Sequence, residues 1–394
     1  MSKLFKKVLA SALSLTLVVG LAGFVGAAAK GTDVVTGTKW ESFSIHGNNA
    51  ADKGKWENEL IKAGQKWCIN ANEASGVDAY KTYGESAKIT KSDASSFLMD
   101  VESTGWSAIY NPMNGKVMGE NPWGVTATKV VNVERGKVYN ISFKIKGLLE
   151  NEITVCDDTT VRKDGTHYTK GTGKFNYVKH FHIKAYDDTD PDGAALSMQS
   201  ITATQGGKNV LTVGRNDKGA VEWNNLIAMD SKNTADDGYV TVNAVVTIPN
   251  DKADYQKKKS VPSLGVKFAF GPYLKNFVDE NNMHGTIEVK DFKVVTGDAA
   301  KGAGKAKVSS IKAKKKSLVV KAKASGASKV KVQVALKKSF KSAKSKTIKS
   351  GKTATFKGLK AKKKYYVRAR GYKLYGTTKI WGAYSKVKSK KTKK

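Results

Sequence analysis

The chain has 394 residues, of which 40% are hydrophobic and 26% are charged, and its formal net charge is +35. The hydrophobic fraction, together with ample Tyr, Phe and Trp, indicates folded domains despite the charge. The two cysteines, Cys68 and Cys156, exclude a disulfide-stapled mini-domain and a cysteine-based zinc cluster, and leave open whether they form one bridge.

Residues 1–29 have the pattern of a secretory signal peptide. Lys3, Lys6 and Lys7 precede an apolar run from Val8 to Val25, and Ala27–Ala29 supplies the small residues of a cleavage site. The alternative is a single membrane anchor, because the run is near the roughly 18 residues that can span a bilayer. We expect cleavage, and therefore a secreted, extracellular protein without a transmembrane anchor. Retention at a cell surface would then depend on charge.

Residues 31–297 contain many short runs typical of β-strands. Polar and apolar positions alternate in Lys137–Ile145, and Tyr239–Ile248 and Ser263–Phe270 behave similarly. Only Lys53–Gln65 has a weakly helical pattern. The sequence therefore predicts an all-β sandwich for this first domain.

Two stretches of this domain resemble jelly-roll carbohydrate-binding modules. Residues 121–147 contain N-P-W-G-V and, further on, G-K-V-Y-N-I-S-F-K-I-K-G, which is similar to a stretch of those modules. The segments F-A-F-G-P-Y (268–273) and G-T-I-E-V-K-D-F-K-V (285–294) look like their closing strands. The resemblance covers about half of residues 31–297. It implies a jelly-roll fold that binds a polysaccharide or other glycan without catalysis.

The resemblance also implies that aromatic rings pack on the apolar faces of sugar rings, while polar side chains bind the hydroxyls. Trp106 and Tyr110 lie in one polar, turn-rich run and Trp123 follows a proline in another, near loops where such a platform could form. The alternative for each Trp is a place in the core. The candidate ligand-binding residues are Trp106, Tyr110, Asn121, Trp123, Glu222, Trp223 and Asn224.

A second local pattern in this domain is the D-x-D-x-D-G loop of Asp188, Asp190 and Asp192. Alternate carboxylates in a tight turn bring hard oxygens together, as calcium requires. The twelfth position of an EF-hand loop would be Gln199, so this is not an EF-hand. We expect either a structural calcium site or an acidic surface turn. His180 and His182 lack a third ligand and are interpreted as ordinary strand residues.

The segment 298–305, which is rich in Gly and Ala, is expected to link the first domain to a second one, residues 306–394. From Ala299 to Lys394 the chain has 33 of its 69 basic residues and no Asp or Glu, whereas residues 1–298 carry 36 basic and 34 acidic residues, a net of +2. Such a segment repels itself and attracts polyanions. Only Arg368 and Arg370 are arginines, and lysine suits diffuse attraction better than bidentate recognition.

The second domain resembles bacterial fibronectin type III domains. The segment L-K-A-K-K-K-Y-Y-V-R-A-R-G-Y (359–372) is similar to their tyrosine corner, and W-G-A-Y-S-K-V (381–387) to the entry into their last strand. The turn proline and the usual early tryptophan are missing. The resemblance implies a seven-stranded, immunoglobulin-like β-sandwich without a catalytic site, usually a spacer or adhesion unit.

Strand periodicity predicts where the charge of this domain lies. The residues expected to face the core are Val330, Val332, Val334, Leu336, Val367, Ala369 and Val387. The polyanion-binding residues expected on the opposite face are Lys329, Lys331, Arg368, Arg370, Lys386 and Lys388, with Tyr366 and Tyr372 among them. The alternative is that the lysines keep the domain soluble and protect its edge strands.

These patterns together predict a secreted, non-catalytic polysaccharide-binding protein that its cationic domain retains on an anionic cell envelope, cell-wall polymer or matrix. The alternatives are an adhesin that binds protein or an anionic polymer, and a polysaccharide hydrolase or lyase, although no glycosidase or lyase motif is evident. Basic charge with interleaved Tyr is also typical of non-specific single-strand binders, but export argues against nucleic acid.

Overall fold

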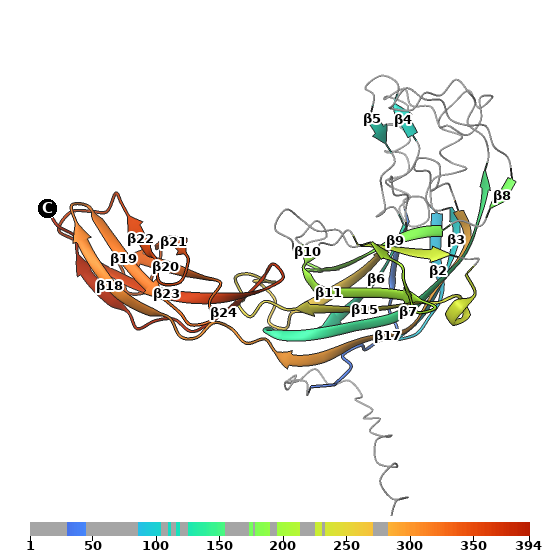
Figure 1. Ribbon diagram of the computed structural model, residues 1–394, viewed down its shortest axis with the longest axis horizontal. Helices are drawn as coiled ribbons and strands as arrows, with labels where there is room; N and C mark the ends of the chain where they lie inside the picture. Colours follow the sequence, from blue (N-terminus) through green and yellow to red (C-terminus); the bar gives the residue numbers. More distant parts are fainter. Residues whose placement is uncertain are drawn as a thin grey trace, which may run out of the picture.

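The computed structural model describes residues 30–44, 86–103, 109–111, 116–118, 125–153, 173–175, 178–189, 195–212, 225–230, 233–270 and 283–394. Within them the structure is all β apart from one 3-10 turn, η2 (Ala235–Gly238). Figure 1 shows two β-sandwiches placed end to end, the second formed by the C-terminal part of the chain. The predicted all-β fold with two sandwiches is therefore confirmed. No helix among the described residues has the length and apolar character to cross a membrane.

The larger sandwich consists of two antiparallel sheets. The first has the order β1 (Glu41–Ser44), β6 (Val125–Asn132), β16 (Ser263–Ala269), β9 (Val178–Tyr186), β14 (Asn225–Asp230) and β13 (Leu211–Thr212), with β10 (Ala195–Leu196) beside β9. The second has the order β12 (Lys208–Asn209), β11 (Met198–Gln205), β15 (Val240–Thr247), β7 (Lys137–Ile153), β17 (Met283–Ala299), β3 (Phe97–Ser103) and β2 (Ser86–Ser92), with β8 (Gly173–Phe175) beside β7. Strands β4 (Ile109–Asn111) and β5 (Lys116–Met118) pair with each other.

The core of the larger sandwich follows from the alternation seen in the sequence. In β7 the side chains of Tyr139, Ile141, Phe143 and Ile145 are buried, whereas the polar residues between them are more exposed. The three strands predicted from alternation, over 137–145, 239–248 and 263–270, are confirmed by β7, β15 and β16. The helix considered for residues 53–65 lies outside the described residues.

Aromatic rings fill the centre of this core around Phe268. Its ring centroid lies within 6.5 Å of those of six other rings, and the shortest separation is 4.8 Å, to Phe143 in the facing sheet. Trp40 belongs to the same cluster, is 7% exposed, and donates its indole N–H to the Asp93 carbonyl at 2.9 Å. Trp40 is therefore a core residue rather than a ligand contact.

The C-terminal sandwich packs a small sheet against a larger one. The small sheet has the order β18 (Lys307–Lys314), β19 (Ser317–Lys323) and β22 (Thr353–Phe356). The larger has β21 (Lys344–Ile348), β20 (Lys329–Ala335), β23 (Lys364–Tyr375) and β24 (Thr378–Trp381), with β25 (Lys388–Lys391) also on β23. The last strand expected from the sequence is thus divided into β24 and β25. The Tyr365 hydroxyl accepts the Lys360 backbone N–H at 2.8 Å, which is the contact of a tyrosine corner.

The connection between the sandwiches is short. Strand β17 continues to Ala299, and Ala303 already lies in the second core. Between them, Lys301 exchanges backbone hydrogen bonds with the Tyr375 hydroxyl at 3.1 and 3.2 Å. A Cβ on Gly382 would overlap the Ala303 carbonyl oxygen, so the chain passes close against the C-terminal sandwich here.

We expect Phe268→Ala to destabilise the larger sandwich by about 3–5 kcal/mol, because it removes the ring at the centre of the core and leaves a cavity. Urea denaturation would measure the free energy of unfolding. Leu336→Ala is the control, because Leu336 is 45% exposed and its truncation should cost under about 0.5 kcal/mol. Equal costs for the two variants would contradict this assignment of the core.

Candidate functional site

The glycan-binding residues expected from the sequence lie almost entirely outside the described residues. These are Trp106, Asn121, Trp123, Glu222, Trp223 and Asn224. Tyr110 is placed in the backbone of β4, but its side chain is not described. Their role in sugar binding stays a prediction.

The charged face expected on the C-terminal sandwich is built by β20 and β23. The two strands are antiparallel neighbours, with Lys331 opposite Arg370 and Lys329 opposite Tyr372. Directly opposite residues point to the same side of a sheet. The residues that alternate with them along each strand, such as Val332 and Ala369, point to the other side of the sheet and are fully buried. Lys329, Lys331, Arg368 and Arg370 therefore lie on one side of this sheet, as expected, and their binding of a polyanion stays a prediction.

Both arginines of that face are held by aromatic rings. The Arg368 guanidinium lies 4.2 Å from the Phe340 ring centroid and 4.0 Å from that of Tyr384, and its Nε donates to the Gln333 amide oxygen at 2.8 Å. The Arg370 guanidinium lies 3.9 Å from the Trp381 centroid and 4.8 Å from Tyr384. A planar guanidinium stacks on rings in this way, which an ammonium cannot do.

The remaining predictions for this face need correction. Lys388 lies opposite Val367, so it is in phase with the core-facing residues of β23 and does not share the side of Arg368. Val387, expected to be internal, is 40% exposed, because β25 begins only after it. Leu336 is also exposed, because β20 ends at Ala335. Lys386 is exposed but lies between β24 and β25, outside the strand expected to hold it.

Arg370 is the centre of the joint between the two sandwiches. It forms an ion pair with Asp251, and both side chains are 17% exposed. Trp381, against which Arg370 packs, donates its backbone N–H to the Asn250 side-chain oxygen at 2.9 Å and its indole N–H to the Asp254 carboxylate at 2.5 Å. The Asn250 amide in turn donates to the Trp381 carbonyl at 2.9 Å. Arg370 is therefore engaged by the larger sandwich and is not a free charge for a polyanion.

The sequence offered no signal for this joint. Trp381 belongs to a motif that predicts a strand, and Asp251 lies in a turn of the other domain that carries no motif. Such a contact between distant segments arises only when both sandwiches are folded. The presence of Arg instead of Lys at position 370 is the one local indication, because arginine is favoured at partly buried ion pairs.

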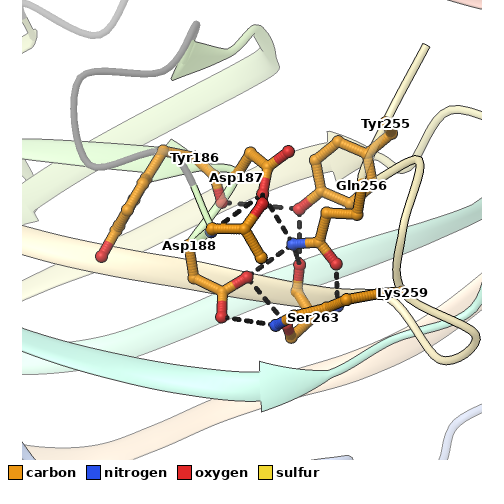
Figure 2. A network of polar contacts seen from close by, with 8 residues as sticks. Tyr186, Asp187, Asp188, Tyr255, Gln256, Lys259 and Ser263 are labelled. Carbon is orange, nitrogen blue, oxygen red and sulfur yellow. Dashed lines mark hydrogen bonds and ion pairs between the residues drawn. The ribbon is translucent and has the colours of Figure 1, made fainter. Parts of the chain in front are cut away.

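Asp188 is the one aspartate of the expected calcium loop that the structure describes. Figure 2 shows its carboxylate among Gln256, Lys259 and Ser263. The Lys259 ammonium donates to Oδ2 at 2.9 Å, and the Ser263 hydroxyl and Gln256 amide donate to Oδ1. A calcium ion on Asp188 would have to displace an ammonium, so this residue fits a cation poorly. Asp190 and Asp192 lie outside the described residues, and among those described no group of three potential ligands gathers.

The same hydrogen-bond network stabilises the segment that contains the joint residues Asn250, Asp251 and Asp254. Gln256, in a left-handed conformation with φ of 44°, also donates to Asp187 and accepts the Ser263 backbone N–H at 2.7 Å. Burial alone would raise the pKa of Asp187, but hydrogen bonds from Thr189 and Gln256 hold it below its usual value. Ser263 is 3% exposed and its hydroxyl is committed to Asp188, so the pairing of Ser263 with Lys259 stabilises structure and does not present a nucleophile.

Tyr186, on the first sheet of the larger sandwich, has two ammonium groups near its ring. The Nζ atoms of Lys267 and Lys184 lie 5.1 and 5.6 Å from its centroid, and the ring covers Gly265, where a Cβ would overlap it. No motif in the sequence indicates this cluster. Since Tyr186 is 6% exposed, it is no open platform for a sugar.

No protein-family model matches the chain, and no curated protein matches it. Among solved structures, one described as "CBM4 structure and function" is 13% identical, over 53% of this chain and 77% of that chain, with a TM-score of 0.25. A β-1,2-glucanase from Parabacteroides distasonis is 11% identical, over 93% of this chain but only 38% of the enzyme, with a TM-score of 0.18. The chicken CNTN1 FN1–FN3 domains are 10% identical, over 67% of this chain and 98% of that chain, with a TM-score of 0.24. At these values the likeness extends no further than an all-β architecture.

We expect Asp251→Asn to weaken the joint by about 2 kcal/mol, because it removes the charged acceptor of Arg370. Small-angle scattering would show a broader distribution of the distance between the sandwiches. Asp254→Asn is the matched control: its amide oxygen can still accept the Trp381 indole N–H, so the distribution should change much less. An unchanged distribution in Asp251→Asn would show that the ion pair does not hold the joint.

The joint should also respond to acid. Burial alone would raise the pKa of Asp251, but hydrogen bonds from the Ala253 N–H and Arg370, with the charges of Arg370 and Lys331, hold it below its usual value. The ion pair thus stabilises the joint above the unfolded-state pKa of about 3.9, and this contribution is lost as the pH falls through the lowered value. The distance distribution should stay constant from about pH 7 to 4 and then broaden. In Asp251→Asn this acid-dependent change should be absent.

Proposed function

We propose that the protein is a secreted, non-catalytic glycan-binding protein. Its larger sandwich binds a polysaccharide, and its C-terminal sandwich attaches it to an anionic polymer of a cell envelope or matrix. The observation that carries the proposal is the separation of charge: residues 299–394 have 33 basic residues and no carboxylate side chain. Among the described carboxylates, Asp251 alone forms an ion pair with this domain.

The lysines are exposed on both sheets of the C-terminal sandwich. On the small sheet, exposed positions include Lys307, Lys312, Lys321 and Lys323, and β25 of the larger sheet carries further ones. Solubility requires net charge but not the complete exclusion of Asp and Glu. An uncompensated positive field of this kind favours long anionic chains, which can contact several faces at once.

The type of basic residue favours diffuse attachment over recognition of one geometry. The two arginines, which could bind a carboxylate or phosphate in a bidentate manner, lie against aromatic rings, and Arg370 is ion-paired. The charges left for a partner are ammonium groups on flexible stems. Attachment should therefore depend strongly on salt.

The larger sandwich has a different character. Residues 1–298 carry nearly equal numbers of basic and acidic residues, so they lack the large net positive charge of the C-terminal sandwich. The proposal assigns sugar binding to Trp106 and Trp123, supported by Tyr110, because rings in turn-rich segments can pack on sugar faces. Asp190 and Asp192 remain a proposed calcium site of this domain, and Asp188, which accepts the Lys259 ammonium, is left out of it.

The test is binding of the full chain to neutral and anionic polysaccharides at low and high salt. We expect binding to anionic polymers to fall steeply with salt, and binding to a neutral glycan to persist. Trp106→Ala and Trp123→Ala should abolish the salt-resistant binding and leave attachment to anionic polymers unchanged. Adding and then chelating calcium tests the metal proposal.

Lys307→Gln/Lys321→Gln/Lys323→Gln provides the reverse control, because it lowers the charge of the C-terminal sandwich without touching the larger one. It should weaken the salt-sensitive binding alone. A chain that binds no neutral glycan at high salt would overturn the first half of the proposal. Failure to bind any anionic polymer at low salt would overturn the second.

A further inference from the structure

A lysine-lined hollow lies at the end of the C-terminal sandwich that is remote from the joint. Its volume is about 440 Å³. It opens to solvent and is lined by the end of β20, the loop from β20 to β21, the beginning of β21, the turn between β22 and β23, and the first residues of β23. Its lining residues include Leu336, Lys337, Lys341, Lys344, Lys360 and Tyr365.

The four lysines of the hollow have no acidic counterpart. Residues 299–394 contain no Asp or Glu, and no carboxylate in the described part of the chain pairs with any of them. Lys344 reaches across the open edge of the sandwich and donates to the Gly358 carbonyl at 3.1 Å. Like charges gathered in one hollow repel one another, and a bound anion would relieve that repulsion.

The backbone that carries these lysines is fixed. In the loop between β20 and β21, Phe340 and Ser342 have left-handed φ angles of 58° and 56°, and Phe340 is buried against Arg368. Backbone strain of this kind persists only where the surroundings enforce it. On the other side, the Lys360 N–H is bonded to Tyr365 and its carbonyl accepts the Thr392 hydroxyl at 2.7 Å. The lysine side chains therefore extend from fixed backbone positions around the hollow.

We propose that this hollow binds one phosphate or sulfate ester of the anionic polymer, together with the sugar or polyol that carries the ester. The assignment rests on the proposed attachment to anionic polymers and gives it a defined site. A tetrahedral ester presents oxygens in several directions, which suits ammonium groups that approach from different elements. A planar carboxylate is matched better by an arginine fork, and the hollow has none. Leu336, which is 45% exposed, supplies apolar surface for the carbon skeleton.

The test compares two triple variants of the full chain with the same net charge. Lys337→Gln/Lys341→Gln/Lys360→Gln empties the hollow of three ammonium groups, and Lys307→Gln/Lys321→Gln/Lys323→Gln removes three from the small sheet. Lys344 is kept because it bonds the turn between β22 and β23. The probes are poly(glycerol phosphate), dextran sulfate and polygalacturonate, at about 150 mM salt, where diffuse attraction is largely screened.

We expect the hollow triple to lose about tenfold or more in affinity for the ester polymers, and the small-sheet triple only about twofold to threefold. The two ester probes show whether phosphate or sulfate is preferred. Equal losses in both triples would overturn the hollow as a site and leave the attachment function intact. Absence of binding by the unsubstituted chain, even at low salt, would instead overturn the attachment function. Tighter binding of polygalacturonate than of either ester polymer would overturn the ester assignment.

Lysine acetylation followed by mass spectrometry gives an independent readout on the unsubstituted chain. Poly(glycerol phosphate) or dextran sulfate should protect Lys337, Lys341 and Lys360 more than Lys307 and Lys321. Uniform protection of all exposed lysines would contradict the proposal. This measurement needs no substitution and therefore does not depend on whether a variant folds.

Discussion

Arg370 has its guanidinium against Trp381 and Tyr384 on one domain and against Asp251 on the other, and the placement of the two sandwiches depends on this contact. A lysine could form the ion pair but could not stack. The turn that carries Asp251 is held in place by hydrogen bonds of Gln256. These bonds join it to the residues that follow β9 and to the first residue of β16. The joint therefore connects the aromatic residues of the C-terminal sandwich to the hydrogen-bonded turn of the larger sandwich.

The C-terminal sandwich must fold despite many like charges. Its core of Val, Ala, Leu and Phe side chains supplies the apolar burial, and lysine stems carry the ammonium groups outward into water. Among the described residues, the two arginines are the basic groups that each lie against two aromatic rings. Since self-repulsion destabilises the compact state, a polyanion bound as proposed would stabilise the fold through the same charges that attract it.

The sequence predicted what depends on local periodicity. The strands around Tyr139 and Phe268 and the inward positions of β20 and β23 follow from alternation. Alternation gave a wrong prediction where the edge strand is interrupted. Lys388 was expected on the side of Arg368 but lies on the other side of the sheet, because the chain between β24 and β25 is not regularly paired with β23. It also gave no hint that Lys129 is buried, with its ammonium bonded to the Gly37 carbonyl at 2.7 Å and 5.1 Å from the Trp40 ring centroid. That contact, like Arg370 with Asp251, joins segments distant in sequence.

Strand β23 relates the two ends of the C-terminal sandwich. It begins at Lys364, has Tyr365 beside the hollow, and runs past Arg370 to Tyr375, whose hydroxyl forms hydrogen bonds with the connecting segment at Lys301. Twelve extended residues span roughly 40 Å. Because the connection between the sandwiches is short and the joint is bonded on several sides, a polymer held at the hollow would keep the larger sandwich at a set distance and direction. The domain would then act as both the attachment and the spacer, with its charge concentrated away from the partner of the larger sandwich.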